Sequence, residues 1–267
     1  MKQDAMLVRD TLIAIVNLNE RLHNEGIDCV IYAAFRAEFF EHPVISAAEI
    51  NNTLLSFGES LSWATFPLDI QHPILEIGSK RIGQFLGENF SPKDLFQTYF
   101  ANVSAEDFLM QTWGKPRDVI RFMNEAKKMF PTKITLTTED YRAVLRKYCK
   151  ESWKEIETAL SAFFDGVGIE KFRALLRELA PRSFSERIPM AEFLSKLEKF
   201  HQAADIGRSE GITFGALTQI LFVMGIYGTA TTDKNGKEIY YRFHRGNENP
   251  DLAGTLELHR AVARAFS

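Results

Sequence analysis

The stretch ITFGALTQILFVMGIYGTATTDKNGKEIYYRFH (residues 212–244) changes character twice, and it determines the fold expected for the C-terminal part of the chain. Residues 212–225 are mainly apolar, contain no Lys or Arg, and close with the helix stop Gly225. Two runs rich in Tyr, Ile and Thr follow, and Asn235-Gly236 between them is the strongest short hairpin signal in the chain. The pattern predicts a buried or protein-facing helix and then a two-stranded hairpin.

Helical patterns dominate the rest of the chain, with one exception. Apolar spacing and capping residues predict helices over 5–24, 45–57, 73–86, 91–100, 104–113, 116–130, 138–164, 168–179, 188–204 and 255–266. The exception is DCVIYAAF (28–35), a short apolar run that predicts one buried strand containing Cys29. We therefore expect a mostly α fold. Helix, helix and hairpin in this order are typical of a winged helix, which we place at 186–267.

The composition excludes several classes of protein. The 267 residues are 45% hydrophobic and 25% charged, which is ordinary for a globular protein. No apolar run reaches the roughly 18 residues that span a membrane, so we expect no membrane partner. The two cysteines, Cys29 and Cys149, fit neither metal spacing nor a disulfide framework and favour a cytoplasmic protein. The six histidines form no zinc-binding pattern, so we expect no metal site.

One segment of the chain is basic. Residues 113–150 carry 10 basic and 4 acidic side chains, whereas residues 1–112 carry 7 basic and 15 acidic ones. A basic segment can meet nucleic acid or phosphate, or it can dock on the acidic first part of the same chain. The charge count leaves both interpretations open.

The basic segment opens with WGKPRDVIRFMNEA, in which Pro116 suits the first turn of a helix. Arg117 and Arg121 lie four residues apart and so share a helix face, with Lys115 close by. Guanidinium groups bind phosphate through a fixed fork of donors, so these side chains are candidates for a phosphate site. The alternative is a patch of surface salt bridges, for example with Asp118.

Sequence features of nucleotide hydrolysis are missing. The phosphate-loop pattern G-x-x-x-x-G-K-[ST] does not occur, nor does an apolar strand ending in the paired acids that hold Mg²⁺. We therefore expect no nucleotide hydrolysis by this chain alone. Arg36 directly follows the run 28–35, and the carboxyl end of a buried strand is where α/β sheets bind ligands. A solvated arginine is the alternative there.

The expected hairpin carries a second set of cations: Lys234, Lys237, Arg242 and Arg245. In a DNA-reading winged helix, polar residues on the preceding helix contact base edges and surrounding cations contact phosphates. The helix expected here offers only Thr213, Thr218 and Gln219 as polar candidates. The pattern favours a protein-facing winged helix and keeps DNA binding as an alternative.

Taken in order, several stretches resemble the C-terminal half of a bacterial P-loop ATPase of the broad AAA+/STAND type. They are FRAEFFE after the apolar run, LSWATFPLDIQHPILEIGSKRI, WGKPRDVIRFMNEA and ITLTTEDYRAVLRKYCKESWKEI, followed by the terminal winged helix. The resemblance covers most of residues 5–267 through motifs of moderate specificity. The half that would hold the Walker A loop and the Walker B strand has no counterpart here.

The resemblance implies three parts: a remnant of the α/β ATPase core at 1–45, a helical lid-like domain at 46–185 and a winged helix at 186–267. It implies a regulatory and interaction module without hydrolysis of its own, whose ATP would be held in a longer parent protein. A stand-alone winged-helix DNA-binding protein is the alternative. A protein partner or self-association is expected, and the bare edge of a lone strand also favours self-association.

The resemblance also assigns roles to individual cations. Arg36 would be the analogue of the sensor-1 residue. Arg117 would be the sensor-2 arginine that reaches the γ-phosphate of a nucleotide, with Lys115 and Arg121 assisting through proximity alone.

Overall fold

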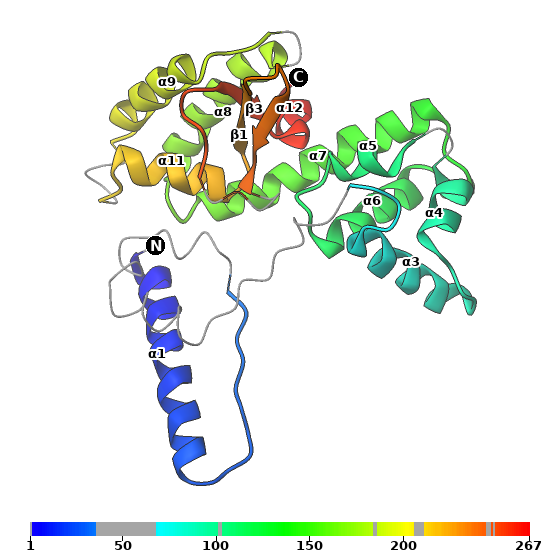
Figure 1. Cartoon of the computed structure of the whole chain (residues 1–267), viewed down its shortest axis with the longest axis horizontal. Helices are drawn as coiled ribbons and strands as arrows, with labels where there is room; N and C mark the ends of the chain where they lie inside the picture. The colour runs from blue at the N-terminus through cyan, green and yellow to red at the C-terminus, as the bar shows by residue number, and fades with distance from the viewer. Residues whose placement is uncertain are drawn as a thin grey trace.

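A computed structural model describes residues 2–35, 68–100, 103–183, 186–205, 211–243, 247 and 249–267 of the chain. These residues are mostly helical, with a small antiparallel sheet near the C-terminal end (Figure 1). The prediction of a mostly α fold is confirmed.

The helices follow the predicted order closely. They are α1 (Lys2–Asn24), α3 (Pro73–Leu86), α4 (Pro92–Tyr99), α5 (Ala105–Leu109), α6 (Pro116–Met129), α7 (Thr138–Leu160), α8 (Gly166–Arg182), α9 (Met190–Ala203), α11 (Phe214–Val223) and α12 (Arg260–Phe266). The helix predicted over 45–57 lies outside the described residues. The helix predicted over 104–113 ends early at Leu109, because the next residues turn toward the start of α6.

Local capping explains several of these boundaries. Ser91 precedes α4, its hydroxyl accepts a hydrogen bond from the backbone N–H of Asp94, and the Asp94 carboxylate accepts one from the N–H of Ser91. Thr137 and Asp140 make the same reciprocal pair at the start of α7. Each pair satisfies two donors that a helix start would otherwise leave open.

The strand predicted over residues 28–35 is wrong. Residues 27–35 form no strand and run back beside α1 (Figure 1). The Asn19 side chain donates a hydrogen bond to the Ile31 carbonyl (2.9 Å) and accepts one from the Ile31 N–H (2.8 Å). A side chain on α1 thus takes both backbone groups that a neighbouring strand would use.

The failure of this strand affects two further predictions. Cys29 is exposed and not in a core, and Tyr32 is 88% exposed. Among residues 2–35 there is therefore no strand of a remnant α/β core, and no lone strand edge to favour self-association.

The described core joins the middle of the chain to its C-terminal end. One cluster of buried side chains runs from Ile74 to Ala263. Helix α6 packs against both α3 and α7, and α12 packs on α7 and α8. The Phe122 ring of α6 lies 5.3 Å from that of Phe108 and 5.5 Å from that of Phe100, so aromatic packing fixes α6 in place. The core continues across the boundary predicted near residue 185.

The predicted hairpin is present and a third strand joins it. Strand β1 (Tyr227–Thr232) pairs antiparallel with β2 (Glu238–Tyr241) and with β3 (Thr255–Leu258), giving the order β2-β1-β3. Gly236 adopts φ 80° in the connecting turn, as the Asn-Gly signal requires. The prediction of one helix over 255–266 is wrong at its start. In TLEL, Leu256 and Leu258 alternate with less buried residues, which is strand periodicity.

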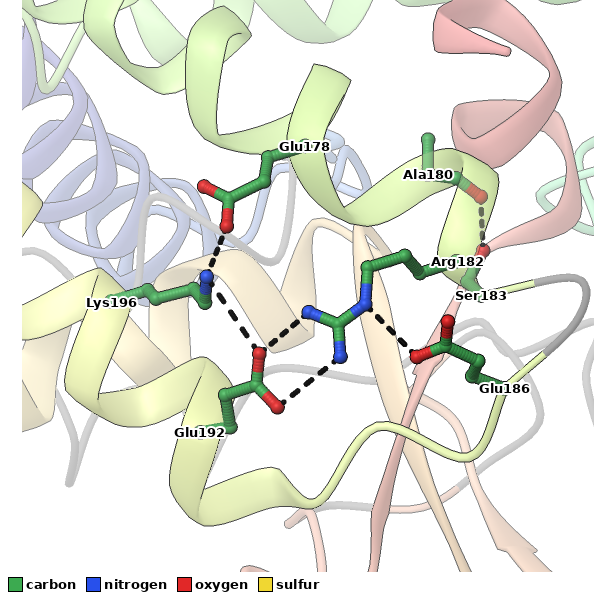
Figure 2. A network of polar contacts seen from close by, with 7 residues as sticks. All are labelled: Glu178, Ala180, Arg182, Ser183, Glu186, Glu192 and Lys196. Atoms are coloured by element: carbon green, nitrogen blue, oxygen red, sulfur yellow. Dashed lines mark hydrogen bonds and ion pairs between the residues drawn. The ribbon is translucent and has the colours of Figure 1, made fainter.

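A network of charged side chains ties α8 to α9 (Figure 2). The Arg182 guanidinium donates to Glu192 (2.6 and 3.4 Å) and to Glu186 (3.0 Å). Lys196 reaches Glu178 and lies 3.7 Å from Glu192. One guanidinium here is surrounded by two carboxylates, and these bonds raise the pKa of Arg182 and lower that of Glu192.

Candidate functional site: an arginine groove on α6

The start of α6 is built around a buried carboxylate. Asp118 is 2% exposed, and its Oδ2 accepts hydrogen bonds from the backbone N–H groups of Trp113 (3.1 Å) and Lys115 (3.0 Å). Gly114 lies between them with φ 68°, a backbone conformation that is strained for residues with a side chain. Pro116 is the first residue of α6, and its ring fixes φ at a helical value. Burial raises the pKa of Asp118, while the Lys115 N–H opposes that rise.

Contacts with the C-terminal part hold this start in position. The Trp113 indole N–H donates to the Gly225 carbonyl (3.2 Å), and its ring stacks on that of His259 at 4.1 Å between centroids. His259 also lies with Nε2 3.0 Å from the Thr112 carbonyl. The loop before α6 is therefore joined to the end of α11 and to the start of α12.

The two arginines of α6 converge on one carboxylate of α7. Arg117 Nη2 lies 2.6 Å from Glu155 Oε2, and Arg121 Nη2 contacts the other oxygen, Glu155 Oε1. Arg121 Nη1 also lies 3.5 Å from the Ser152 hydroxyl. Arg117 is the more exposed of the two side chains, at 53% against 23% for Arg121. The predicted shared helix face is confirmed, and the acidic neighbour is Glu155 and not Asp118.

These side chains line an open groove of about 750 Å³ between α3, α6 and α7. Its cations are Arg81, Arg117, Arg121, Lys128 and Lys154, and its carboxylates are Glu125, Glu151 and Glu155. Lys128 pairs with Glu125 at 2.6 Å and Lys154 with Glu151 at 3.0 Å. Once these pairs are set aside, the lining of the groove contains three arginines and one carboxylate, which leaves a local positive excess.

The structure brings some predicted residues together and not others. Arg117 and Arg121 meet in the groove, whereas Lys115 lies half-buried just before α6 and is not among the groove's lining residues. Arg36 lies outside the described residues. Arg81 and Glu155 were not predicted, because nothing in the sequence says that α3 and α7 both pack on α6.

The hairpin cations have different surroundings. Lys234 and Lys237 are exposed at the hairpin tip and form no ion pair with the described residues. Arg242 is 12% exposed and makes a two-pronged ion pair with Glu257 of β3, so its charge is matched inside the sheet. Arg245 lies outside the described residues.

The helix before the hairpin is buried mainly in its C-terminal half. In α11, Leu217 and residues 220–223 are buried, and its N-cap is Thr213. Gln219 and Thr218 are not buried, and the Thr218 hydroxyl donates to the Gly215 carbonyl at 2.7 Å. The C-terminal half of α11 is buried, in agreement with the predicted buried helix, whereas residues 214–216 at its start are half-buried or exposed.

Other chemistry is not assembled in the part of the chain that the structure describes. Cys149 is buried, and burial raises the pKa of its thiol to about 12, which suits packing rather than reactivity. The described residues contain no group of three or more His, Cys, Asp or Glu side chains that could hold a metal ion. Among the described helices, none combines the length and apolar character needed to cross a membrane.

Comparisons with known proteins leave the family open. No protein-family model, curated protein or solved structure matches the chain.

Proposed function

We propose that the chain is a regulatory and interaction module without hydrolysis of its own, whose α6 arginines sense the phosphates of a nucleotide held by a larger parent protein or a partner. The observation that carries this proposal is the convergence of Arg117 and Arg121 on one anion position at the wall of an open groove. Two guanidinium groups that share a helix face can each donate to a different oxygen of one phosphate.

The packing around α6 supports coupling between the groove and the rest of the module. Trp113 and His259 join the loop before α6 to the C-terminal helices and sheet. A phosphate that pulls on Arg117 would therefore act on an element attached to the winged-helix-like part. A ligand shifts a conformational equilibrium when it binds more tightly to one position of such an element than to the other. A protein partner or self-association, and a cytoplasmic location, belong to the same proposal.

Calorimetric titration of ATP and of inorganic pyrophosphate into the chain at low salt tests the proposal. Because no phosphate loop contributes, we expect weak binding, with Kd on the order of 1 mM, that weakens further as salt rises. The double variant Arg117→Ala/Arg121→Ala should bind at least about tenfold more weakly. Binding that is unchanged in this variant would refute the proposal, and micromolar ATP binding would refute the absence of a phosphate cradle.

DNA binding is a second candidate because of Lys234 and Lys237 at the exposed hairpin tip. Two features weigh against it: the C-terminal half of α11 is buried, and Arg242 is paired with Glu257. A helix whose side chains are buried in the protein has few side chains left to contact base edges in a major groove. Duplex binding that falls steeply with salt and is reduced in Lys234→Ala/Lys237→Ala would favour this candidate over the first.

A further inference from the structure

We infer that Glu155 is an internal, displaceable ligand of the groove, and that a phosphate group binds between Arg117 and Arg121 in exchange for its carboxylate. Arg81 on the α3 wall is then a third cation for the incoming phosphate. This inference rests on the proposed function and adds to it a means of regulation and two residues, Glu155 and Arg81.

The first support is the geometry of the shared carboxylate. Each oxygen of Glu155 is taken by a different arginine, so one two-oxygen anion bridges two guanidinium groups. Among the ion pairs that the described residues form, this is the case in which two arginines share one carboxylate. A phosphate group carries more oxygens and more negative charge than a carboxylate, so it can satisfy both arginines more fully.

The second support is the freedom of the Glu155 side chain to leave. It is 37% exposed and lies on the wall of an open groove, so rotation toward solvent exchanges its arginine contacts for water. Its neighbours do not enclose it, in contrast to Glu257, which is 22% exposed beside Arg242 within the sheet. The pair that Glu155 forms with Arg117 is exposed, and exposed ion pairs are held weakly, which makes exchange feasible there. Its pair with Arg121 is partly buried.

The third support is the remaining cation. Arg81 is exposed on α3, lines the same groove and forms no ion pair with the described residues. Since α3 and α7 both pack on α6, the groove offers charge from more than one wall. An anion larger than a carboxylate can use this additional charge.

The exchange has a consequence for affinity. Glu155 competes with any phosphate in solution, so the isolated module binds free anions weakly. A phosphate held nearby by a parent protein or partner has a high effective concentration and can overcome this competition. Glu155 therefore makes the groove respond to phosphate that is presented to it and not to the phosphate of the bulk solution.

The test measures the affinity of inorganic pyrophosphate for the wild-type chain and for Glu155→Gln, by calorimetry at low salt. Gln keeps the shape of the side chain and removes its charge, so we expect about tenfold tighter binding. The matched control is Glu151→Gln, which removes a carboxylate one turn away on the same wall that pairs with lysines instead. Its effect should be under about threefold, since it changes only the general charge of the groove. The double variant Glu155→Gln/Arg81→Ala should bind pyrophosphate several-fold more weakly than Glu155→Gln alone.

The outcomes separate this inference from the proposed function. If the wild type binds through Arg117 and Arg121 but Glu155→Gln binds no more tightly, or no more so than Glu151→Gln, the exchange is refuted and the proposed function stands. If neither protein binds pyrophosphate, or if binding survives Arg117→Ala/Arg121→Ala, the proposed function itself fails. Circular dichroism and the Tm of each variant establish that it is folded, and a lower Tm without a gain in affinity assigns Glu155 a purely structural role.

Discussion

The groove on α6 and the network between α8 and α9 are both built from arginines and carboxylates that join neighbouring helices, yet their charge ratios are opposite. In the groove, Arg117 and Arg121 share the single carboxylate of Glu155. In the network, the single guanidinium of Arg182 is surrounded by two carboxylates (Figure 2). Each arrangement connects two helices, but the first has cations in excess and the second has anions in excess.

This difference indicates which cluster can take an external anion. Arg182 would have to lose both Glu186 and Glu192 before another anion could reach it, and the remaining carboxylates would repel that anion. In the groove, loss of one contact partner frees two guanidinium groups at once. We therefore expect the ratio of guanidinium to carboxylate groups, together with an open groove, to indicate an anion site better than the number of cations does.

The largest effect is expected from Asp118→Ala, which removes the carboxylate at the start of α6, beside the groove, and does not change the α8–α9 network. Removing the buried carboxylate leaves the N–H groups of Trp113 and Lys115 without their acceptor, so we expect a loss of about 2–4 kcal/mol in the free energy of unfolding. Urea denaturation measures this. Asp94→Ala is the matched control, because Asp94 caps α4 at an exposed position and should cost much less. Equal losses in the two variants would show that burial of Asp118 has no special weight.

The groove also shows what the sequence could and could not predict. Helix α6 was predictable because Pro116, the helical spacing and the apolar residues after it are local signals, and Arg117 and Arg121 share a face wherever a helix forms. The partner Glu155 lies 34 residues beyond Arg121, and only the packing of α7 on α6 brings it near. Local signals locate the cations, but the three-dimensional fold decides what neutralises them.

The errors have the same origin. The run 28–35 is apolar enough for a strand, but a strand needs a partner, and the side chain of Asn19 takes the backbone groups of Ile31 instead. The apolar residues of 255–258 continue into α12 at helical spacing, and this pattern predicts a helix there. Pairing with β1, which the sequence does not reveal, decides that they form a strand.

A smaller effect than that of Asp118→Ala is expected from pH, and the stability of the two regions should depend on pH in opposite directions. Burial raises the pKa of Asp118, so the folded state holds its proton to higher pH than the unfolded chain does. Its contribution to stability is therefore present at acid pH, and it is lost as pH rises from about 4 through the folded pKa. In the network, Arg182 lowers the pKa of Glu192, so that contribution is present above the unfolded pKa and is lost as pH falls.

The variant Asp118→Asn isolates the first of these effects. It keeps the size of the side chain and cannot titrate, so subtracting its free energy of unfolding from that of the wild type cancels the other carboxyl groups. We expect this difference to become less favourable to the wild type as pH rises from about 4 to 8. Urea denaturation over that range measures it. A difference that grows more favourable to the wild type would mean that the N–H donors of Trp113 and Lys115 outweigh burial.

The smallest effect is expected from Arg182→Ala, and it tests the comparison directly. Arg182 and its two carboxylates are substantially exposed, with side-chain exposures of 34%, 53% and 34%, so water and salt screen their attraction. We expect the Tm to fall by no more than about 2 °C, and by less in high salt. Pyrophosphate affinity should not change, because the guanidinium removed is already paired with two carboxylates and does not line the groove. A fall in Tm above about 5 °C would make the network a principal support of the fold, and a weaker affinity for pyrophosphate would mean that charge ratio does not distinguish the two clusters.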